Sequence, residues 1–143
     1  MTGTELPLAG VRVVEMTHMV MGPTCGMILA QLGAEVIKVE PPAGDKTRSL
    51  GGMGISFFPL FNRGKRSVVL DLARPEDRET MHRLLAGADV FLENFRDGQL
   101  DKQGRGGCLQ QDIEPARAET HARRAELRSD LPGVHLVIQR HQF

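Results

Sequence analysis

Two glycine-containing segments of the 143-residue sequence have residue types that could bind an anionic ligand. In residues 17–26 (THMVMGPTCG), Gly22 and Pro23 are typical of a helix start, whose free backbone N–H groups can hold a phosphate. No GxGxxG pattern is present, so ordinary strand-to-helix geometry is the simpler interpretation. Residues 62–66 (NRGKR) place three cations around a glycine, which could meet phosphate oxygens or form a solvated turn.

Single side chains offer further candidates. His18 could carry a proton near neutral pH, although a lone histidine in a loop is more often a bystander. Cys25 falls in a first helical turn, where a thiol pKa can be lowered. The spacing puts no base beside it, so we interpret Cys25 as a packed small side chain.

Four carboxylates lie near predicted strand ends: Asp71, Glu93, Asp97 and Asp101. A carboxylate nucleophile needs dry surroundings and a group that stabilises the oxyanion. Nothing in the spacing selects one of the four, so we interpret them as solvated or capping acids and assign no catalytic residue from spacing.

Alternating elements must position these groups. Apolar, β-branched runs predict strands at residues 11–16, 34–40, 67–72 and 88–95. Helices are expected over 25–32, closed by Gly33, and from Pro75 until Gly87 ends the helix. Residues 43–54 are interpreted as a mobile loop and 55–61 (ISFFPLF) as an apolar patch interrupted by proline. The order predicts an α/β fold with a parallel sheet and a ligand rim at the strands' carboxyl ends.

Composition narrows the function classes. Eighteen basic and eighteen acidic residues cancel, which argues against a general nucleic-acid or membrane-surface binder. Two distant cysteines predict neither a disulfide framework nor a metal site. No apolar run is long enough for a membrane span, and the first residues lack a signal-peptide pattern. We therefore expect a cytoplasmic protein without a metal.

Four separated blocks, in order, carry a specific resemblance: strand-turn-GP-helix, LGAEVIKVEPP, NRGKRSVVLDL and ENFRDG. Over about residues 6–103 the chain resembles the opening of class III CoA transferases, the CaiB/BaiF group of formyl-CoA transferases and 2-methylacyl-CoA racemases. The resemblance implies a Rossmann-like CoA-binding segment over 6–103, an incomplete half-domain. It also implies acyl-CoA and a carboxylic acid as substrates, CoA transfer through an aspartyl-CoA intermediate, and an interlocked homodimer.

The positions that contact CoA in that family correspond here to Val20, Met21, Leu70, Asp71, Leu72, Ala73, Asn94, Phe95, Arg96 and Lys102. Backbone and apolar groups would hold adenine and pantetheine, and Arg96 and Lys102 would meet phosphates. This sequence departs from the family pattern in two positions: Val20 stands where some transferases have Gln, and Pro41 where an Arg can occur.

The family's nucleophilic aspartate lies downstream of the matched region, and residues 104–143 resemble nothing in the family. This tail has six Arg and no Lys; a helix over 114–128 and a strand over 134–138 are the elements expected in an otherwise irregular segment. We expect a truncated transferase that is inactive alone, with a tail read out of frame. The alternative is a short non-catalytic CoA- or nucleotide-binding module or a regulatory partner of a full-length homologue.

Overall fold

The structure, a computed structural model, describes residues 5–52, 54–95 and 135–138. Nine elements follow one another in this part of the chain: β1 (Arg12–Met16), α1 (Met21–Gln31), β2 (Glu35–Glu40), the short 3-10 helix η1 (Lys46–Ser49), α2 (Gly54–Phe61), β3 (Arg66–Val69), α3 (Pro75–Ala86), β4 (Val90–Glu93) and β5 (His135–Ile138).

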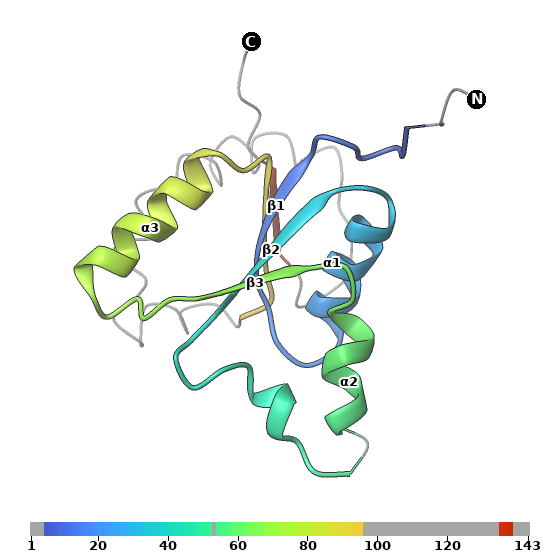
Figure 1. The fold of residues 1–143 in the computed structure, drawn as a ribbon, viewed down its shortest axis with the longest axis vertical. Helices are drawn as coiled ribbons and strands as arrows, with labels where there is room; N and C mark the ends of the chain where they lie inside the picture. The colour runs from blue at the N-terminus through green and yellow to red at the C-terminus, as the bar shows by residue number, and fades with distance from the viewer. Residues whose placement is uncertain (1–4, 53, 96–134, 139–143) are drawn as a thin grey trace.

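One five-stranded sheet organises these elements, in the order β3-β2-β1-β4-β5. The first four strands in that order run parallel, and β5 runs antiparallel to β4. Figure 1 shows α3 on one side of the sheet and α1 with α2 on the other. The predicted α/β architecture with a parallel sheet is therefore confirmed.

Successive residues of a strand point to opposite faces of the sheet, and helices cover both faces (Figure 1), so each face carries buried side chains. On one face, Val14, Val39 and Phe91 pack with Met81 and Leu85 of α3. On the opposite face, a second cluster joins the sheet to α1; its members are Val13, Val36, Leu92, Cys25 and Leu29. Each large apolar side chain buried in this way contributes about 1.5–3 kcal/mol to the free energy of unfolding.

Most predicted boundaries are close to those observed. Gly33, at φ 104°, follows the end of α1, and Gly87 caps α3, which begins at Pro75 with Glu76 and Asp77 in its first turn. Three elements differ more from their predicted bounds: α1 starts earlier, β3 ends earlier, and β4 covers residues 90–93 where the sequence predicts a strand over 88–95. α1 begins at Met21, since Pro23 falls in the first turn, where a missing N–H breaks no helical bond.

β3 ends at Val69, whereas the sequence predicts a strand to residue 72. Leu70 still donates its N–H to Glu40 O at 2.9 Å. The next N–H, that of Asp71, turns away and donates to Asp77 Oδ2 at 2.8 Å. This contact with the first turn of α3 ends the ladder.

The region 43–61 is more regular than the sequence predicts. Asp45 caps η1 by accepting the N–H of Thr47 at 2.8 Å, so the expected loop contains a turn of 3-10 helix. Residues 54–61 form α2 with Pro59 inside it. Asn62 closes this helix, because its backbone N–H and its Nδ2 both donate to Phe58 O.

Only residues 135–138 of the tail are described, and the strand predicted there is confirmed as β5. The predicted helix over 114–128 and the boundary at residue 103 lie outside the described residues. Among the residues that are described, no helix has the length and apolar character needed to cross a membrane.

Candidate functional site

The turn after β1, residues 17–20, is held by side chains from two other elements. His18 donates its N–H to Asn94 Oδ1 at 3.0 Å, and Asn94 Nδ2 donates to His18 O at 2.9 Å. Asn94 follows β4, so both backbone groups of His18 are bound from the neighbouring strand. Met19 donates its N–H to Thr47 Oγ1 at 3.0 Å, which ties the turn to η1 as well.

Met19 has φ 66°, in the left-handed region. This conformation costs a residue with a side chain about 1–2 kcal/mol, so it persists only where surrounding contacts fix it. The hydrogen bonds at His18 and Met19 supply those contacts. As a result, the Met19 and Met21 side chains are exposed, at 43% and 59%, and present an apolar surface at the carboxyl end of β1.

Gly22 allows α1 to start in contact with this turn. A Cβ atom at residue 22 would lie 2.6 Å from Thr17 Cβ and 3.0 Å from Asn94 Cγ. The space beside Gly22 is therefore filled by the protein's own side chains. The glycine serves close packing between helix and turn, which is the structural interpretation given to residues 17–26 above.

Beneath the turn lie four buried charged residues, Glu15, Lys38, Asp45 and Lys65, here called the buried charge cluster. Lys38 Nζ lies 3.4 Å from Glu15 Oε1 and 3.0 Å from Asp45 Oδ2. Lys65 Nζ lies 2.8 Å from Glu15 Oε2. No side chain of the four is more than 3% exposed, and two cations balance two anions.

Both ammonium groups also bind backbone oxygens. Lys38 Nζ donates to Thr17 O at 2.7 Å, and Lys65 Nζ donates to Pro23 O at 2.8 Å. Burial lowers the pKa of Lys65, against the opposing charge of Glu15. Burial acts to raise the pKa of Asp45, but hydrogen bonds from Thr47 and the charge of Lys38 bring that pKa below its ordinary value.

Glu40 links four elements next to the cluster. Arg48 of η1 donates through Nε and Nη2 to the two Glu40 oxygens, at 2.8 Å each. Ser67 of β3 donates to Glu40 Oε1 at 2.6 Å. These bonds, with Arg48 foremost, lower the pKa of Glu40 to about 2. The Arg48 guanidinium lies 3.6 Å from the ring centroid of Phe58, which fastens α2 to the same group.

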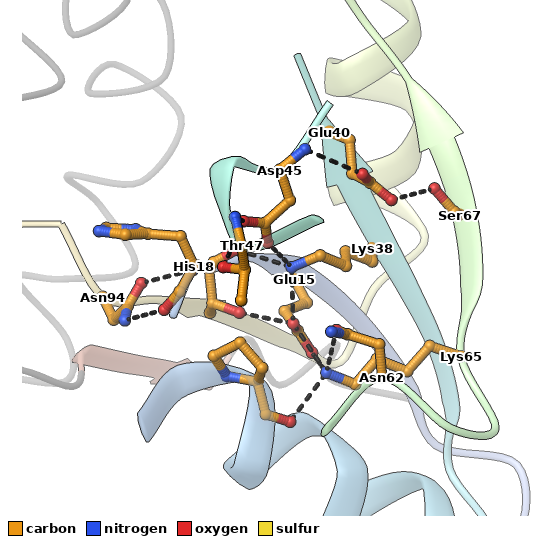
Figure 2. A network of polar contacts seen from close by, with 12 residues as sticks. Glu15, His18, Lys38, Glu40, Asp45, Thr47, Asn62, Lys65, Ser67 and Asn94 are labelled. Carbon is orange, nitrogen blue, oxygen red and sulfur yellow. Dashed lines mark hydrogen bonds and ion pairs between the residues drawn. The ribbon is translucent and has the colours of Figure 1, made fainter. Parts of the chain in front are cut away.

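The structure brings four of the predicted CoA contacts to one edge. Val20 and Met21 continue the turn that Asn94 binds, and the Phe95 ring lies 5.2 Å from the His18 ring. Figure 2 shows His18 and Asn94 meeting here, at the carboxyl ends of β1 and β4. Arg96 and Lys102 lie outside the described residues.

The remaining predicted contacts, Leu70 to Ala73, follow β3. The side chains of Leu70 and Leu72 are buried in the core cluster against α3, so only their backbone groups could meet a ligand. Asp71 accepts the N–H of Ala73 at 3.1 Å. This bond agrees with the capping role that the sequence suggests for Asp71.

The structure corrects the picture of a basic turn at residues 62–66. Lys65 points inward into the buried charge cluster, and Arg66 pairs with Glu35 at 2.8 Å. The turn therefore does not present three free cations. Glu93 is buried, so it is not a solvated acid, and its Oε2 accepts the N–H of Phe95; Asp97 and Asp101 lie outside the described residues.

Cys25 is half-buried, and the interpretation as a packed side chain is confirmed. Burial raises the pKa of its thiol, Glu15 adds to the rise, and Lys65 opposes it. Within the described residues, no group of three or more His, Cys, Asp or Glu could hold a metal ion.

Sequence reasoning missed Glu15, Lys38 and Glu40 as buried charges, and it interpreted Lys65 as part of a basic turn. The available signal was a charged residue inside an apolar strand, as in VRVVEM and AEVIKVE. Strands buried on both faces cannot leave such charges in water, and a buried charge requires a partner. The interpretation of these runs as simply apolar overlooked that requirement.

Comparisons with known proteins give a consistent result. A model of CoA-transferase family III matches residues 8–116. Succinate–glutarate CoA-transferase of Agrobacterium fabrum is 41% identical over 115 residues, which cover 73% of this chain and 29% of that protein. Succinyl-CoA–D-citramalate CoA-transferase of Chloroflexus aurantiacus is 44% identical over 105 residues, or 70% and 26% of the two chains.

A solved structure of a CAIB/BAIF family protein from Brucella suis is similar to this chain with a TM-score of 0.63 and 46% identity. The match covers 71% of this chain and 29% of the other. The chain thus spans less than a third of the length of the curated relatives it matches.

Proposed function

Because the chain belongs to CoA-transferase family III, we propose that its residues 6–103 carry the CoA-binding rim of an enzyme that moves CoA between carboxylic acids. The observation that carries the proposal is the joining of the turn at Val20 and Met21 to Asn94 and Phe95. In open parallel sheets, ligands bind beyond the carboxyl ends of the strands, which is where these residues lie.

The chemistry of the rim suits the parts of CoA. The exposed side chain of Met21 and the Phe95 ring offer apolar surface to pantetheine or adenine. Ala73, exposed after β3, is a further predicted contact, although its N–H is bound to Asp71 and its carbonyl to Arg78. By resemblance to the family, Arg96 and Lys102 would pair with the phosphates.

The acyl step is proposed to need a carboxylate other than Glu15 and Glu40, both of which are buried next to the rim. Glu15 is buried against Lys65, and Glu40 is bound by Arg48 with a pKa of about 2. Carboxylates held in this way by cations are poor nucleophiles toward a thioester. We therefore propose that the chain binds CoA and does not transfer it alone. The interlocked homodimer and the cytoplasmic location stay predictions.

Calorimetric titration of the chain with CoA tests the binding. We expect a Kd of roughly 10 μM, and a titration without heat at several temperatures would contradict the proposal. Met21→Glu should weaken binding about tenfold or more, because it removes apolar surface and repels phosphates. Ile28→Glu is the matched control, since Ile28 is a similarly exposed residue on the same helix, two turns from the rim.

A transfer assay tests the second half of the proposal. Succinyl-CoA with glutarate is the first pair to use, because a relative is named for succinate and glutarate. We expect no new thioester from the chain alone; turnover that a carboxylate substitution in this chain abolishes would contradict us. A chain that binds CoA and alters the rate of a full-length relative would indicate the regulatory alternative, which no observation here favours.

A further inference from the structure

The two lysines of the buried charge cluster bind opposite ends of one backbone segment, residues 17–23, here called the rim turn. Lys38 Nζ donates to Thr17 O at its start, at 2.7 Å, and Lys65 Nζ donates to Pro23 O at its end, at 2.8 Å (Figure 2). The lysines come from β2 and from the residues before β3. The rim turn is thus held at once from β2 and from the segment that precedes β3.

A single carboxylate keeps both lysines in place. Glu15 of β1 accepts from Lys65 Nζ at 2.9 Å and from Lys38 Nζ at 3.4 Å, through the same Oε1 atom. Asp45 supplies the second anion, at 3.0 Å from Lys38 Nζ. Because Glu15 and Lys38 are register partners on neighbouring strands, the geometry follows directly from the sheet.

The middle of the rim turn contains Met19, whose φ of 66° is strained, and its described contacts are with neutral side chains. Its neighbours are held by neutral groups, Asn94 on His18 and Thr47 on Met19 itself. Thr47 in turn donates its hydroxyl to Asp45 Oδ1 at 2.7 Å, so the central contact also depends on the cluster.

Hydrophobic side chains could replace a buried ion pair with little loss of stability. They could not donate hydrogen bonds to the Thr17 and Pro23 carbonyls. The cost of burying four charges is therefore explained by what the ammonium groups do for the rim turn, beyond what they contribute to packing.

We propose that Lys38 and Lys65 are positioning residues that fix the backbone of the rim turn, with Glu15 and Asp45 as their counter-ions. The part of this proposal that concerns CoA binding rests on the proposed function above. The part that concerns the ligand-free protein does not. Without the two ammonium donors, the rim turn should lose the conformation that places Val20 and Met21.

Charge-balanced double variants separate positioning from stability. Lys65→Met with Glu15→Gln removes one cation and one anion together, and Lys38→Met with Asp45→Asn does the same for the other pair. Each single lysine variant leaves the buried charge cluster with one negative charge in excess, so it should unfold at lower urea concentration. We expect the double variants to recover most of the stability that the single lysine variants lose.

Amide hydrogen exchange in the ligand-free chain is the deciding measurement. The His18 and Met19 amides should exchange about tenfold faster or more in both doubles, while core amides such as that of Val14 keep their protection. The exposed pair supplies the control: Arg66→Met with Glu35→Gln removes the same charges and should leave the rim turn unchanged. Doubles whose His18 and Met19 amides exchange as in the unaltered chain would overturn the proposal.

CoA titration then adds the functional readout. We expect each double to bind CoA about tenfold more weakly although its stability has recovered. If the unaltered chain binds no CoA, the proposed function fails, while the exchange result still decides whether the lysines position the turn. Should exchange rise in the doubles with CoA affinity unaltered, the link from the rim turn to CoA would be wrong.

Discussion

Gly26 of α1 lies directly against the carboxylate of Glu15 in β1. A Cβ atom at residue 26 would lie 1.8 Å from Glu15 Oε2, far inside van der Waals contact. The carboxylate has little room to move, because it is fully buried and paired with Lys65, whose Nζ would itself lie 3.1 Å from that Cβ atom. The missing side chain at residue 26 therefore sets how closely α1 approaches the sheet.

Gly26→Ala should lower the free energy of unfolding by about 2 kcal/mol, since overpacking and displacement of the ion pair outweigh the better helix propensity of alanine. Gly51→Ala is the matched control, because a Cβ at residue 51 would meet nothing within 4 Å. Urea unfolding of both variants provides the measurement. Equal stability of the two would mean that Glu15 is not confined by α1.

Acid should destabilise the protein through Glu40. Its pKa falls from an ordinary value of 4.5 to about 2, so its stabilising effect is complete above pH 4.5 and is lost as the pH falls toward 2. Arg48 is 48% exposed, so screening by water reduces the effect to about 1–2 kcal/mol.

Urea unfolding at pH 7, 4 and 2.5 measures this loss. Glu40→Gln should flatten the acid slope without abolishing it, because the pKa of Asp45 is lowered too. Glu76→Gln, at an exposed pair with Arg74, should leave the slope nearly unchanged. If stability falls with acid equally steeply in both variants, Glu40 is not a cause of the acid destabilisation.

Arg96 and Lys102 are predicted to pair with CoA phosphates. Arg96→Ala and Lys102→Ala should each weaken CoA binding by about tenfold, and the loss should shrink at high salt. Arg83→Ala, on the exposed face of α3, is the charge-matched control. Titration with CoA and with its 3′-dephospho form shows which phosphate each residue meets; unchanged affinities for both forms would exclude these residues from the site.

Cys25 should be a slow nucleophile. Burial and the charge of Glu15 raise its thiol pKa, so its alkylation rate should reach half-maximum at a higher pH than that of a free thiol. Peptide-resolved mass spectrometry with iodoacetamide separates Cys25 from Cys108. Lys65→Met should raise the pH of half-maximum further, because Lys65 lowers this pKa; faster labelling of Cys25 than of glutathione at pH 7 would contradict the structure.

The fold was largely predictable because its signals are local. Pro75 with Glu76, and the glycines at 33 and 87, mark helix ends through backbone chemistry that depends on a few neighbours. The early end of β3 was not predictable, since it depends on a bond from Asp71 to Asp77 that forms only once α3 is placed. α2 was not predicted either. Pro59 usually interrupts a helix, and the sequence alone did not show that Asn62 would end this one by donating to Phe58 O.

The candidate site also has parts that the sequence predicts and parts that it does not. Val20, Met21 and Asn94 could be placed at one edge from strand order alone, because parallel strands end together. The inward direction of Lys65 could not be predicted, because NRGKR is typical of a surface turn and only the position of Glu15 in β1 explains why this lysine is buried. Pairing between distant charges is a tertiary property that no short window contains.

The antiparallel direction of β5 has a practical consequence. His135 pairs with Glu93 at the rim, where the parallel strands end. Ile138 pairs with Val90 at the opposite end of the strands, where β1 also begins at Arg12. The polypeptide therefore enters the first strand and departs from the last on the side remote from the ligand edge. A dye or surface linker attached close to Arg12 or Ile138 should leave the opposite end of the strands open for the proposed binding of CoA.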